Sequence, residues 1–358
     1  MKLLVVNDQF ERGGAGRVAA IQCNALYERG YDIVIVTDTQ NWNQTYTINS
    51  NIHILQIKTK SSNRLWKWYS CSRKIRQYIN QEKPNVIIAI QSMMFFVTWL
   101  GSIGINIPII AADHTSFNRK IHPLIDFIRY HFYSKASGLS ILTQKDYDIL
   151  GNRFPQKKVI YNPISFPILE NESQRKKNIL CVGRLDVWEI KGFDIIISLW
   201  AQIHKQYPEW VLEIAGTGTI ESIEYLENLI RNNNLQERVI LLGQISNMKE
   251  LYTHSSIFAL SSRMEGFPMA LMEAMSQGCS CIAFSVYGAT KEMMENESGI
   301  IVDDGDILGF KKGLIDLLEN ENLREMYSKS AIKSTYKFTV DNFIKQWEEL
   351  IKKSLLIF

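Results

Sequence analysis

Cysteine is scarce in this chain and forms no pattern that binds a metal. The five cysteines, Cys23, Cys71, Cys181, Cys279 and Cys281, are odd in number, include no C-x-x-C pair and have no histidine at metal-ligand spacing. A disulfide framework and a structural zinc site are therefore not expected. Reduced cysteines are typical of a cytosolic protein.

A strong excess of charge of one sign is also missing. The chain has 40 Lys and Arg against 37 Asp and Glu, which gives a net charge of +3. That balance is too mild to indicate a protein that binds nucleic acid, and no nucleic-acid partner is expected. The basic residues are nevertheless unevenly distributed, because several of them gather between residues 58 and 78.

A signal peptide and an uninterrupted membrane span are not evident either. The first apolar run is short and is followed at once by Asp8, Glu11 and Arg12, which is unlike a secretory leader. Residues 93–112 are long enough to cross a bilayer, but glycines and a proline divide them into an expected helix, turn and strand. We therefore expect a cytoplasmic protein.

What is present is a regular alternation of short apolar strands and longer amphipathic segments. This alternation predicts an α/β fold with parallel sheets and crossover helices. The pattern loses its periodicity near 165–177 and then starts again, and 358 residues suit two domains. We predict two Rossmann-like domains, 1–165 and 166–339, and a separate C-terminal helix in 340–358. Ligands of such sheets bind beyond the carboxyl ends of the strands, so two facing sheets place the site in the cleft between them.

The segment EGFPMALMEAM, residues 265–275, joins a Gly-Pro turn to a run of helix formers with a carboxylate at each end. A helix that begins near Pro268 would present its free N–H groups to an anion. Because a carboxylate repels an anion, we expect Glu265 to accept hydrogen bonds from hydroxyls of the same ligand, as a phosphorylated sugar offers. Glu273 has apolar neighbours, and a buried carboxylate needs partners.

Two further segments carry groups suited to phosphate. Arg184 and Lys191 follow a strand and could neutralise a diphosphate, although two solvated surface cations are the alternative. Gly13 and Gly14 follow the first strand and would let backbone approach a ligand, although they do not complete the G-x-G-x-x-G fingerprint of dinucleotide sites.

Several segments agree in their order with one family. The chain resembles the retaining glycosyltransferases of family 4, whose E-x7-E motif matches Glu265 and Glu273, and is similar to bacterial enzymes that extend polysaccharide or lipid-linked oligosaccharide chains. The resemblance implies the GT-B fold, with two Rossmann-like domains facing across a cleft and the last helix possibly crossing back to the first domain. The other matching segments are ERGGAGR (11–17), AADHTSF (111–117), YNPI (161–164) and VGRLDVWEIKGFD (182–194).

The resemblance implies a catalytic role for four residues. Glu265 would bind hydroxyls of the transferred sugar, and His114 would touch that sugar near its C6 hydroxyl. Arg184 and Lys191 would hold the donor phosphates and stabilise the leaving group. Arg184 is the firmer of the two, because the segment DVWEI makes the spacing to Lys191 longer than the family's.

The remaining roles implied by the resemblance concern the nucleotide-sugar donor. Glu273 would bind the ribose hydroxyls. The other donor-binding residues would be Gly13, Gly14, Asn162, and Gly266, Phe267 and Met269 with their backbone N–H groups. For Asn162 an Asx turn ahead of Pro163 is an alternative, and a lone histidine such as His114 is more often structural.

No bound metal and no cofactor are expected beyond the donor itself. Two D-x-D triplets occur, at 146–148 and 304–306, and this motif binds the metal of other glycosyltransferases. The first would open a helix, where acids suit the N-terminus, and the second would form a turn. Positive side chains and a helix terminus would take over charge stabilisation.

The basic segment 58–78 contains no acid and mixes cations with tryptophan and tyrosine. This composition suits an anionic membrane surface or a pyrophosphate-linked lipid acceptor, although a solvated amphipathic helix remains an alternative. A second basic segment, 117–135, would support the same face. The acceptor or membrane residues are predicted to be Arg64, Trp66, Lys67, Trp68 and Arg73.

The sequence thus predicts a metal-independent, retaining transferase that moves a hexose or N-acetylhexosamine from a nucleotide sugar, by resemblance a UDP-sugar, to a lipid-linked or growing surface-glycan acceptor. Its expected location is the cytoplasmic face of the membrane, as a peripheral protein. Two alternatives stay open. One is a sugar-nucleotide epimerase of the same fold, for which Asp113 is the obvious additional carboxylate, and the other is a non-catalytic protein that binds nucleotide sugars.

Overall fold

The computed structural model describes residues 1–10, 13–39, 46–57, 63–117, 122–171 and 174–357, and the side chain of Arg64 lies outside that description. The chain divides into two compact units. The N-terminal domain comprises Met1–Pro163 and Phe338–Phe358, and the C-terminal domain comprises Ile164–Lys337. The boundaries fall at 163 and 337, against 165 and 339 in the sequence-based division.

The N-terminal domain is built on a parallel sheet of seven strands in the order β3-β2-β1-β4-β5-β6-β7. The inner strands are apolar and buried on both faces, as expected of parallel sheets covered by helices, whereas the edge strands β3 and β7 are partly exposed. The strands are β1 (Lys2–Asn7), β2 (Asp32–Thr37), β3 (His53–Gln56), β4 (Val86–Ile90), β5 (Ile109–Ala112), β6 (Gly138–Ile141) and β7 (Lys157–Val159).

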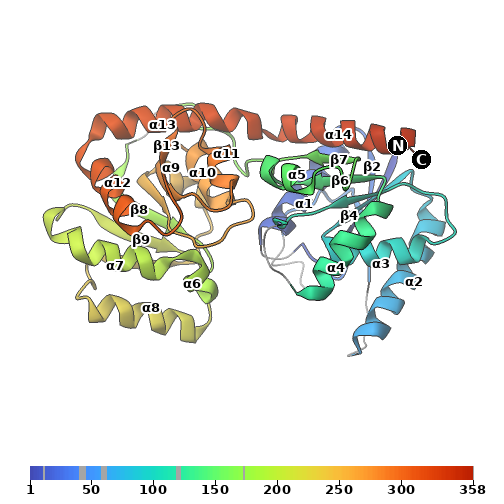
Figure 1. The fold of residues 1–358 in the computed structure, drawn as a ribbon, viewed down its shortest axis with the longest axis horizontal. Coiled ribbons are helices and arrows are strands. Elements are labelled where there is room, and N and C mark those ends of the chain that lie inside the picture. The colour runs from blue at the N-terminus through green and yellow to red at the C-terminus, as the bar shows by residue number, and fades with distance from the viewer. Residues whose placement is uncertain (11–12, 40–45, 58–62, 118–121, 172–173, 358) are drawn as a thin grey trace. The chain divides into compact units, whose positions relative to one another are not determined.

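Helices cover both faces of this sheet (Figure 1). One face carries α1 and α14, and the other carries α2, α3 and α4 side by side. Residues 93–112 are divided between α3, a turn and β5, as the sequence predicts. The helices are α1 (Gly14–Glu28), α2 (Arg64–Glu82), α3 (Ser92–Ser102), α4 (Pro123–Phe132), α5 (Gln144–Leu150) and α14 (Val340–Ile357).

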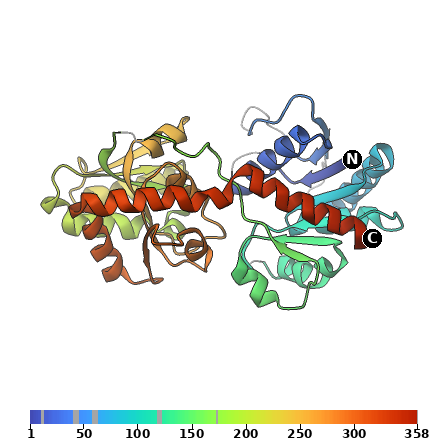
Figure 2. The same cartoon turned by 90° about the horizontal axis from the view of Figure 1, so that it is seen from above.

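The final helix packs on the N-terminal domain, and Figure 2 shows α14 lying along that domain. Its buried residues include Phe343, Trp347, Leu350 and Ile351, the apolar positions at helical spacing. Gly138 of β6 lets α14 come close, because a Cβ there would lie 3.0 Å from the Leu350 side chain.

The C-terminal domain has a second parallel sheet, of six strands in the order β10-β9-β8-β11-β12-β13. One face packs against α7, α8 and α12, and the other against α9, α10 and α13 (Figure 1). The strands are β8 (Lys176–Val182), β9 (Val211–Ala215), β10 (Val239–Gly243), β11 (Ser255–Leu260), β12 (Ser280–Phe284) and β13 (Gly299–Val302). The helices are α6 (Trp188–Lys191), α7 (Phe193–Ile203), α8 (Ile220–Asn232), α9 (Met248–Thr253), α10 (Met269–Ser276), α11 (Ala289–Met293), α12 (Ile307–Glu319) and α13 (Glu321–Thr335).

Candidate functional site

The first group of candidate residues lies beyond the carboxyl ends of β8 and β11 in the C-terminal domain. These strands are neighbours in the sheet but not in the chain, and the strand order reverses between them. Such a reversal is a topological switch point, where open α/β sheets bind their ligands. The segment after β8 carries Arg184 and Lys191, and the segment after β11 carries Glu265.

Lys191 and Glu265 form an ion pair at this switch point. The ammonium of Lys191 donates to Oε1 of Glu265 over 2.8 Å, and the two side chains are 24% and 9% exposed. The hydroxyl of Ser262 donates to the same oxygen over 2.7 Å. Both bonds go to Oε1, so Oε2 keeps its capacity to accept hydrogen bonds from a ligand.

Two glycines allow the segments after β8 and β11 to come this close. Gly192 has a φ of 66°, and a Cβ there would lie 1.9 Å from the carbonyl oxygen of Ser261. At Gly183 a Cβ would lie 3.1 Å from Cδ of Lys191, so the lysine stem passes over that glycine. Lys191 therefore reaches Glu265 because neither glycine carries a side chain that would hold the two segments apart.

The residues between Arg184 and Lys191 are helical, not an irregular loop. A 3-10 turn, Leu185–Val187, runs directly into α6 and returns Lys191 toward the end of β8. Arg184 remains 68% exposed and binds Asp186, with Nε donating to Oδ1 over 3.0 Å. This hydrogen bond raises the pKa of Arg184 and lowers that of Asp186. The structure thus brings Lys191, rather than Arg184, to Glu265.

Glu273 lies in α10 and is 3% exposed, so it is buried, as its apolar neighbours in the sequence indicate. A buried carboxylate needs hydrogen-bond partners. The hydroxyl of Ser165 donates to its Oε1 over 2.7 Å, and the hydroxyl of Tyr252 donates to its Oε2 over 3.2 Å. Both partners are hydroxyls, the group that a ribose also offers.

The N-terminus of α10 follows the Gly-Pro turn. Pro268 is the N-cap and Met269 the first helical residue, so the helix begins one residue later than the proline rule suggests. No side chain caps this end, and its first N–H groups have no acceptor within the helix. Gly266 and Met269 are partly exposed, whereas Phe267 is buried. An anion near this terminus would meet free N–H groups and the positive end of the helix dipole.

The second group of candidates belongs to the N-terminal domain and follows β5. In the described part of the chain, both ring nitrogens of His114 are buried and make no hydrogen bond of normal geometry, although the Asn162 side chain lies close enough to affect the ring. Burial lowers the pKa of His114, and the effects of Asp113 and Asn162 oppose this shift only in part. A neutral imidazole results, which offers one donor and one acceptor.

Asp113, beside His114, is fully engaged by the protein. Its Oδ2 accepts from Nε of Arg129 and from the hydroxyl of Tyr133, each over 2.8 Å, and its Oδ1 accepts from the N–H of Thr115 over 2.9 Å. Asp113 and Arg129 are 4% and 1% exposed. Asp113 therefore holds the fold together. An epimerase would need this carboxylate to face its substrate, and Asp113 does not.

Asn162 and the glycines after β1 complete the N-terminal candidates. Among the described residues, Oδ1 of Asn162 is buried and accepts no hydrogen bond, so the Asx turn considered for this residue is not formed. Gly13 is the N-cap of α1 with a φ of 123°, and no atom lies within 4 Å of the position of a Cβ. Gly14 is the first residue of α1, and both glycines are exposed. Backbone here is accessible to a ligand.

Each D-x-D triplet has a structural use for one of its aspartates. Asp146, in the first turn of α5, accepts hydrogen bonds from Thr143, Ser116 and the N–H of Phe117. Asp306 caps α12 by accepting from the N–H of Gly309. In the ranges that the structure describes, no three side chains of His, Cys, Asp and Glu form a group that could hold a metal ion.

Comparison with known families assigns both parts of the chain. The model described as "Glycosyltransferase Family 4" matches residues 12–166. The model described as "Glycosyl transferases group 1" matches residues 168–334. The chain belongs to the glycosyltransferases.

Relatives of this glycosyltransferase align with it over nearly their whole length. The "Amylovoran biosynthesis glycosyltransferase AmsD" of Erwinia amylovora is 27% identical over 98% of this chain and 99% of its own. The "GalNAc-alpha-(1->4)-GalNAc-alpha-(1->3)-diNAcBac-PP-undecaprenol alpha-1,4-N-acetyl-D-galactosaminyltransferase" of Campylobacter jejuni is 24% identical over 98% of both chains.

Solved structures show the same fold. The structure of Anabaena HepE in complex with UDP and glucose has a TM-score of 0.81 to this glycosyltransferase at 17% identity, and the match covers 98% of this chain and 99% of that one. The predicted α/β fold of GT-B type, with two Rossmann-like domains, is thereby confirmed.

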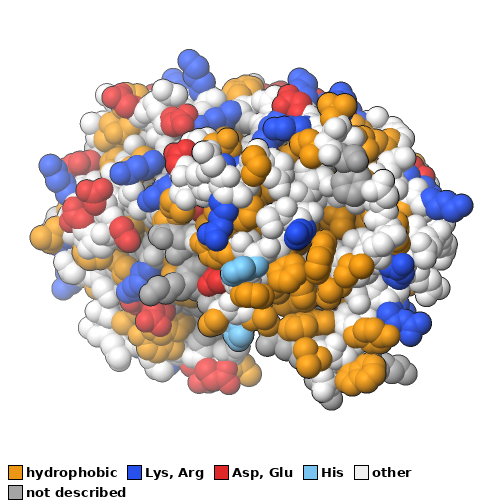
Figure 3. Space-filling model, turned by 45° about the vertical axis from the view of Figure 1, so that its right-hand side comes forward, with side chains coloured by type: hydrophobic (Ala, Val, Ile, Leu, Met, Phe, Trp, Pro, Cys, Tyr) orange, Lys and Arg blue, Asp and Glu red, His pale blue; other side chains and the backbone are white. Residues whose placement is uncertain are grey.

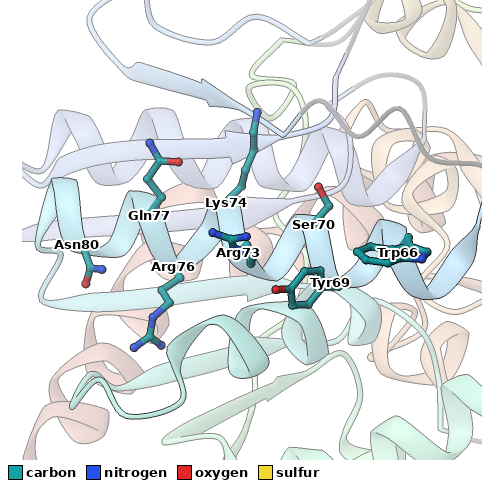
Figure 4. A pocket seen from close by; sticks show the side chains of 8 residues that line it. All are labelled: Trp66, Tyr69, Ser70, Arg73, Lys74, Arg76, Gln77 and Asn80. Carbon is teal, nitrogen blue, oxygen red and sulfur yellow. The ribbon is translucent and has the colours of Figure 1, made fainter.

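The predicted acceptor or membrane residues lie on α2 of the glycosyltransferase. An open depression of about 660 Å³ runs along this helix, with Trp66 and Tyr69 toward its N-terminal end and Arg73, Lys74 and Arg76 further on (Figure 4). Trp66 is 62% exposed. Lys67 is half exposed and pairs with Asp38 over 3.7 Å. Residues 58–62 of the basic segment lie outside the described residues, as does the side chain of Arg64.

Trp68 of the same helix is only partly exposed, because its ring packs into an aromatic cluster. Its ring meets Phe96 of α3 edge to face, and Phe96 and Trp99 both meet Phe132 of α4. Phe127 of α4 extends the cluster and is 51% exposed. Figure 3 shows hydrophobic side chains gathered on the face brought forward, with Lys and Arg side chains around them.

Sequence reasoning missed the partners of the motif residues. Ser262, Ser165 and Tyr252 hold the two glutamates, but a serine or tyrosine has no sequence signal that separates this use from many others. In the sequence, Arg129 stands out only as part of a basic segment, whereas in the structure it is buried beside Asp113. In the described part of the chain, no helix is both long and apolar enough to span a membrane.

Proposed function

We propose that this glycosyltransferase moves a hexose or an N-acetylhexosamine from a UDP-sugar to a hydroxyl of a lipid-linked or growing surface-glycan acceptor, with retention of the anomeric configuration and without a metal ion. The observation that carries the proposal is the pair of Lys191 and Glu265 at the switch point. A cation and a hydroxyl-accepting carboxylate within one hydrogen bond suit a ligand in which a phosphate is joined to a sugar.

Each group of the C-terminal domain would bind one part of the donor. The ammonium of Lys191 has three donors, so it can bind a phosphate oxygen while it stays near Glu265. Glu265 would accept hydrogen bonds from hydroxyls of the transferred sugar, and the start of α10 would bind the diphosphate. Glu273 would accept from the ribose hydroxyls, the kind of partner that Ser165 and Tyr252 supply now.

The N-terminal domain would supply a neutral hydrogen-bonding group. His114 presents two buried ring nitrogens without partners, and leaving such groups unsatisfied costs about 1–3 kcal/mol. A sugar hydroxyl can both donate and accept, so it would satisfy either tautomer of the ring. Because the imidazole is neutral, we assign it hydrogen bonding to the substrate and not the role of a cation.

In the proposed reaction, the bond between the anomeric carbon and the diphosphate oxygen breaks first, with build-up of oxocarbenium character at the sugar. The acceptor hydroxyl forms the new bond to the anomeric carbon on the face that the diphosphate leaves. Its proton passes to the departing phosphate oxygen, so UDP and the glycoside are the products. The protein's contribution is then to position both substrates and to stabilise the charge on the leaving group.

The relatives support the donor and the acceptor class. HepE was solved with UDP and glucose, which supports a UDP-sugar as the donor. The Campylobacter jejuni relative is named for an acceptor linked to PP-undecaprenol, which supports a lipid-diphosphate acceptor. The use of Asp146 and Asp306 in fixing local structure supports catalysis without a bound metal, because these carboxylates already serve the fold.

We further propose that α2 faces an anionic membrane, at the cytoplasmic side where lipid-linked acceptors would be extended. Trp66 and Tyr69 are exposed next to Arg73 and Lys74, and the aromatic cluster of α3 and α4 adjoins the same helix. Amphipathic aromatic rings with flanking cations favour the headgroup region of an anionic leaflet.

The experiment is a set of transfer reactions with UDP-sugars and a lipid-diphosphate oligosaccharide in EDTA. Product formation is followed by UDP release, and the anomeric configuration of the product is read by NMR. We expect acceptor-dependent release with an α-linked product from an α-linked donor. A β-linked product would contradict retention, and activity only after metal addition would contradict metal independence. Interconversion of two UDP-sugars without acceptor would instead identify an epimerase.

A further inference from the structure

The segment that follows β5, residues 113–117, is held from two sides by buried charged side chains. Asp113, Thr115, Ser116 and Phe117 each contact one or both of them, and His114 lies between. We propose that Arg129 and Asp146 are positioning residues of the sugar site, which fix this segment so that the imidazole of His114 is presented to substrate. The proposal rests on the role of His114 given above and adds two residues to it.

Arg129 holds three residues of the segment with its whole guanidinium. Nε donates to Asp113 over 2.8 Å, one terminal nitrogen donates to the carbonyl of Thr115 over 2.6 Å, and the other donates to the carbonyl of Ser116 over 3.3 Å. The guanidinium also lies 3.7 Å from the ring centroid of Phe117. A lysine cannot reproduce this fork, because its ammonium is a point charge without planar, divergent donors.

Asp146 holds the other end of the segment. Its Oδ1 accepts from the hydroxyl of Ser116 over 3.1 Å and from the N–H of Phe117 over 2.8 Å. Its Oδ2 accepts from the hydroxyl of Thr143 over 2.9 Å, which fixes the carboxylate on α5. Asp146 is 1% exposed. The first D-x-D triplet thus contributes to the site through the hydrogen bonds of Asp146 to Ser116 and Phe117.

His114 differs from its neighbours, because in the described part of the chain neither Arg129 nor Asp146 binds its side chain. The residues on both sides are tied to Arg129 or Asp146, whereas both ring nitrogens of His114 are buried and unsatisfied. Charged groups buried at this depth are costly unless they are paired and hydrogen-bonded, and the hydrogen bonds described above tie Arg129 and Asp146 to this segment. The arrangement is therefore suited to hold one imidazole in place for a ligand.

The first test reads the position of His114 without relying on activity. Ring signals of the six histidines are recorded by heteronuclear NMR in wild type, and His114 is assigned with His114→Gln. We expect Arg129→Lys and Asp146→Asn to shift the His114 signals and to leave those of the other histidines in place. Unchanged His114 signals in both variants would overturn the proposal.

The second test separates positioning from a general loss of stability. Arg129→Lys is expected to lower kcat/KM at least about tenfold, on the scale at which small misplacements of catalytic groups act. In the His114→Gln background, Arg129→Lys should lower kcat/KM by less than about twofold, because the effects of coupled residues do not add. Equal losses in both backgrounds would show a merely structural role.

A matched control is available in the C-terminal domain. Arg238 also donates to three carbonyl oxygens, those of Tyr207, Pro208 and Trp210, and lies over the ring of Trp200. Arg238→Lys should leave the His114 signals unchanged. It should also change kcat/KM by the same factor in wild type and in the His114→Gln background. If Arg129→Lys does not fold, Ser116→Ala removes a single bond to Asp146, and it must shift the His114 signals in a smaller but measurable way or the proposal fails.

The role of His114 and the positioning role of Arg129 and Asp146 can be tested separately. If His114→Gln transfers sugar as fast as wild type, the role of His114 is wrong, whereas the NMR signals still show whether Arg129 and Asp146 fix the ring. If the ring signals do not respond but His114→Gln is inactive, His114 acts on substrate and the positioning proposal is wrong.

Discussion

Nζ of Lys191 lies 2.8 Å from Oε1 of Glu265, although 74 residues separate them in the chain. The pair exists because α6 returns the lysine over Gly183 and because Gly192 lets the backbone pass against Ser261. Both residues follow strands that are adjacent at the switch point of the C-terminal sheet. The positions where the strand order reverses thus carry the charges on which the proposed chemistry depends.

Lys191 should matter more than Arg184 for transfer. Lys191→Met removes the cation beside Glu265 and should lower kcat/KM about 100-fold, as does loss of one stabilising donor in other enzymes. Arg184→Met removes an exposed cation paired with Asp186 and should cost less than about threefold. The measurement is steady-state UDP release by the two variants under identical conditions. The reverse order of the two effects would show that Arg184 moves to the donor phosphates and Lys191 does not.

The backbone at Gly192 should tolerate no side chain. Gly192→Ala would place a Cβ 1.9 Å from the Ser261 carbonyl oxygen, so the segments after β8 and β11 would have to separate. Gly243→Ala is the matched control, because it has the same φ of 66° but no atom within 4 Å. Left-handed backbone alone destabilises an alanine by about 1–2 kcal/mol. We expect Gly192→Ala to lower the free energy of unfolding, measured in urea, by more than that. Equal losses would mean that the close approach is not under constraint.

His114 should contribute to the pH dependence of stability. Burial lowers its pKa below the ordinary value of 6.5, so the unfolded chain binds the proton more readily than the folded protein. The free energy of unfolding should therefore fall as the pH drops below about 6.5, and level off below the folded pKa. Urea unfolding between about pH 7.5 and 5 should show a smaller decrease for His114→Gln than for wild type. A decrease of the same size in both proteins would contradict a buried, neutral imidazole.

Membrane binding should depend on the exposed half of α2. Arg73→Gln should weaken binding to anionic vesicles about fivefold, which corresponds to the roughly 1 kcal/mol that one basic residue contributes at such a surface. Trp66→Ser should weaken binding to a similar or greater extent, because it removes an interfacial ring. The readout is cosedimentation with vesicles that contain or lack anionic lipid. Gln81→Ser, on the same helix, serves as the control, and an equal effect of all three changes would argue against a specific surface.

Much of the fold is readable from the sequence. Buried parallel strands are nearly continuous apolar runs, so β1, β2, β4, β8, β9 and β11 stand out, and residues 93–112 divide as the breakers predict. Short edge strands such as β7, with Lys157 and Lys158, carry no such signal. The helix at 185–191 was missed as well, because two single turns lack a periodic pattern.

The candidate site was readable only where a motif fixes spacing. Glu265 and Glu273 are one motif, and their roles as partly and fully buried carboxylates follow from its turn and helix. The preference for Arg184 over Lys191 rested on spacing along the chain, whereas the returning turn of α6 decides which cation reaches Glu265. The hydrogen bonds of Arg129 and Asp146 to the segment 113–117 join residues 13 to 30 positions apart, which no local pattern specifies.

The most direct measurement compares acceptor-dependent UDP release by wild type, Glu265→Gln and Glu295→Gln. Glu295 forms a similar pair with Lys337, 2.7 Å long, on the surface of the same domain. The account predicts a loss of about 100-fold or more for Glu265→Gln, because the carboxylate is replaced where the transferred sugar would bind, and no more than about a twofold change for Glu295→Gln. Full activity of Glu265→Gln would contradict the account.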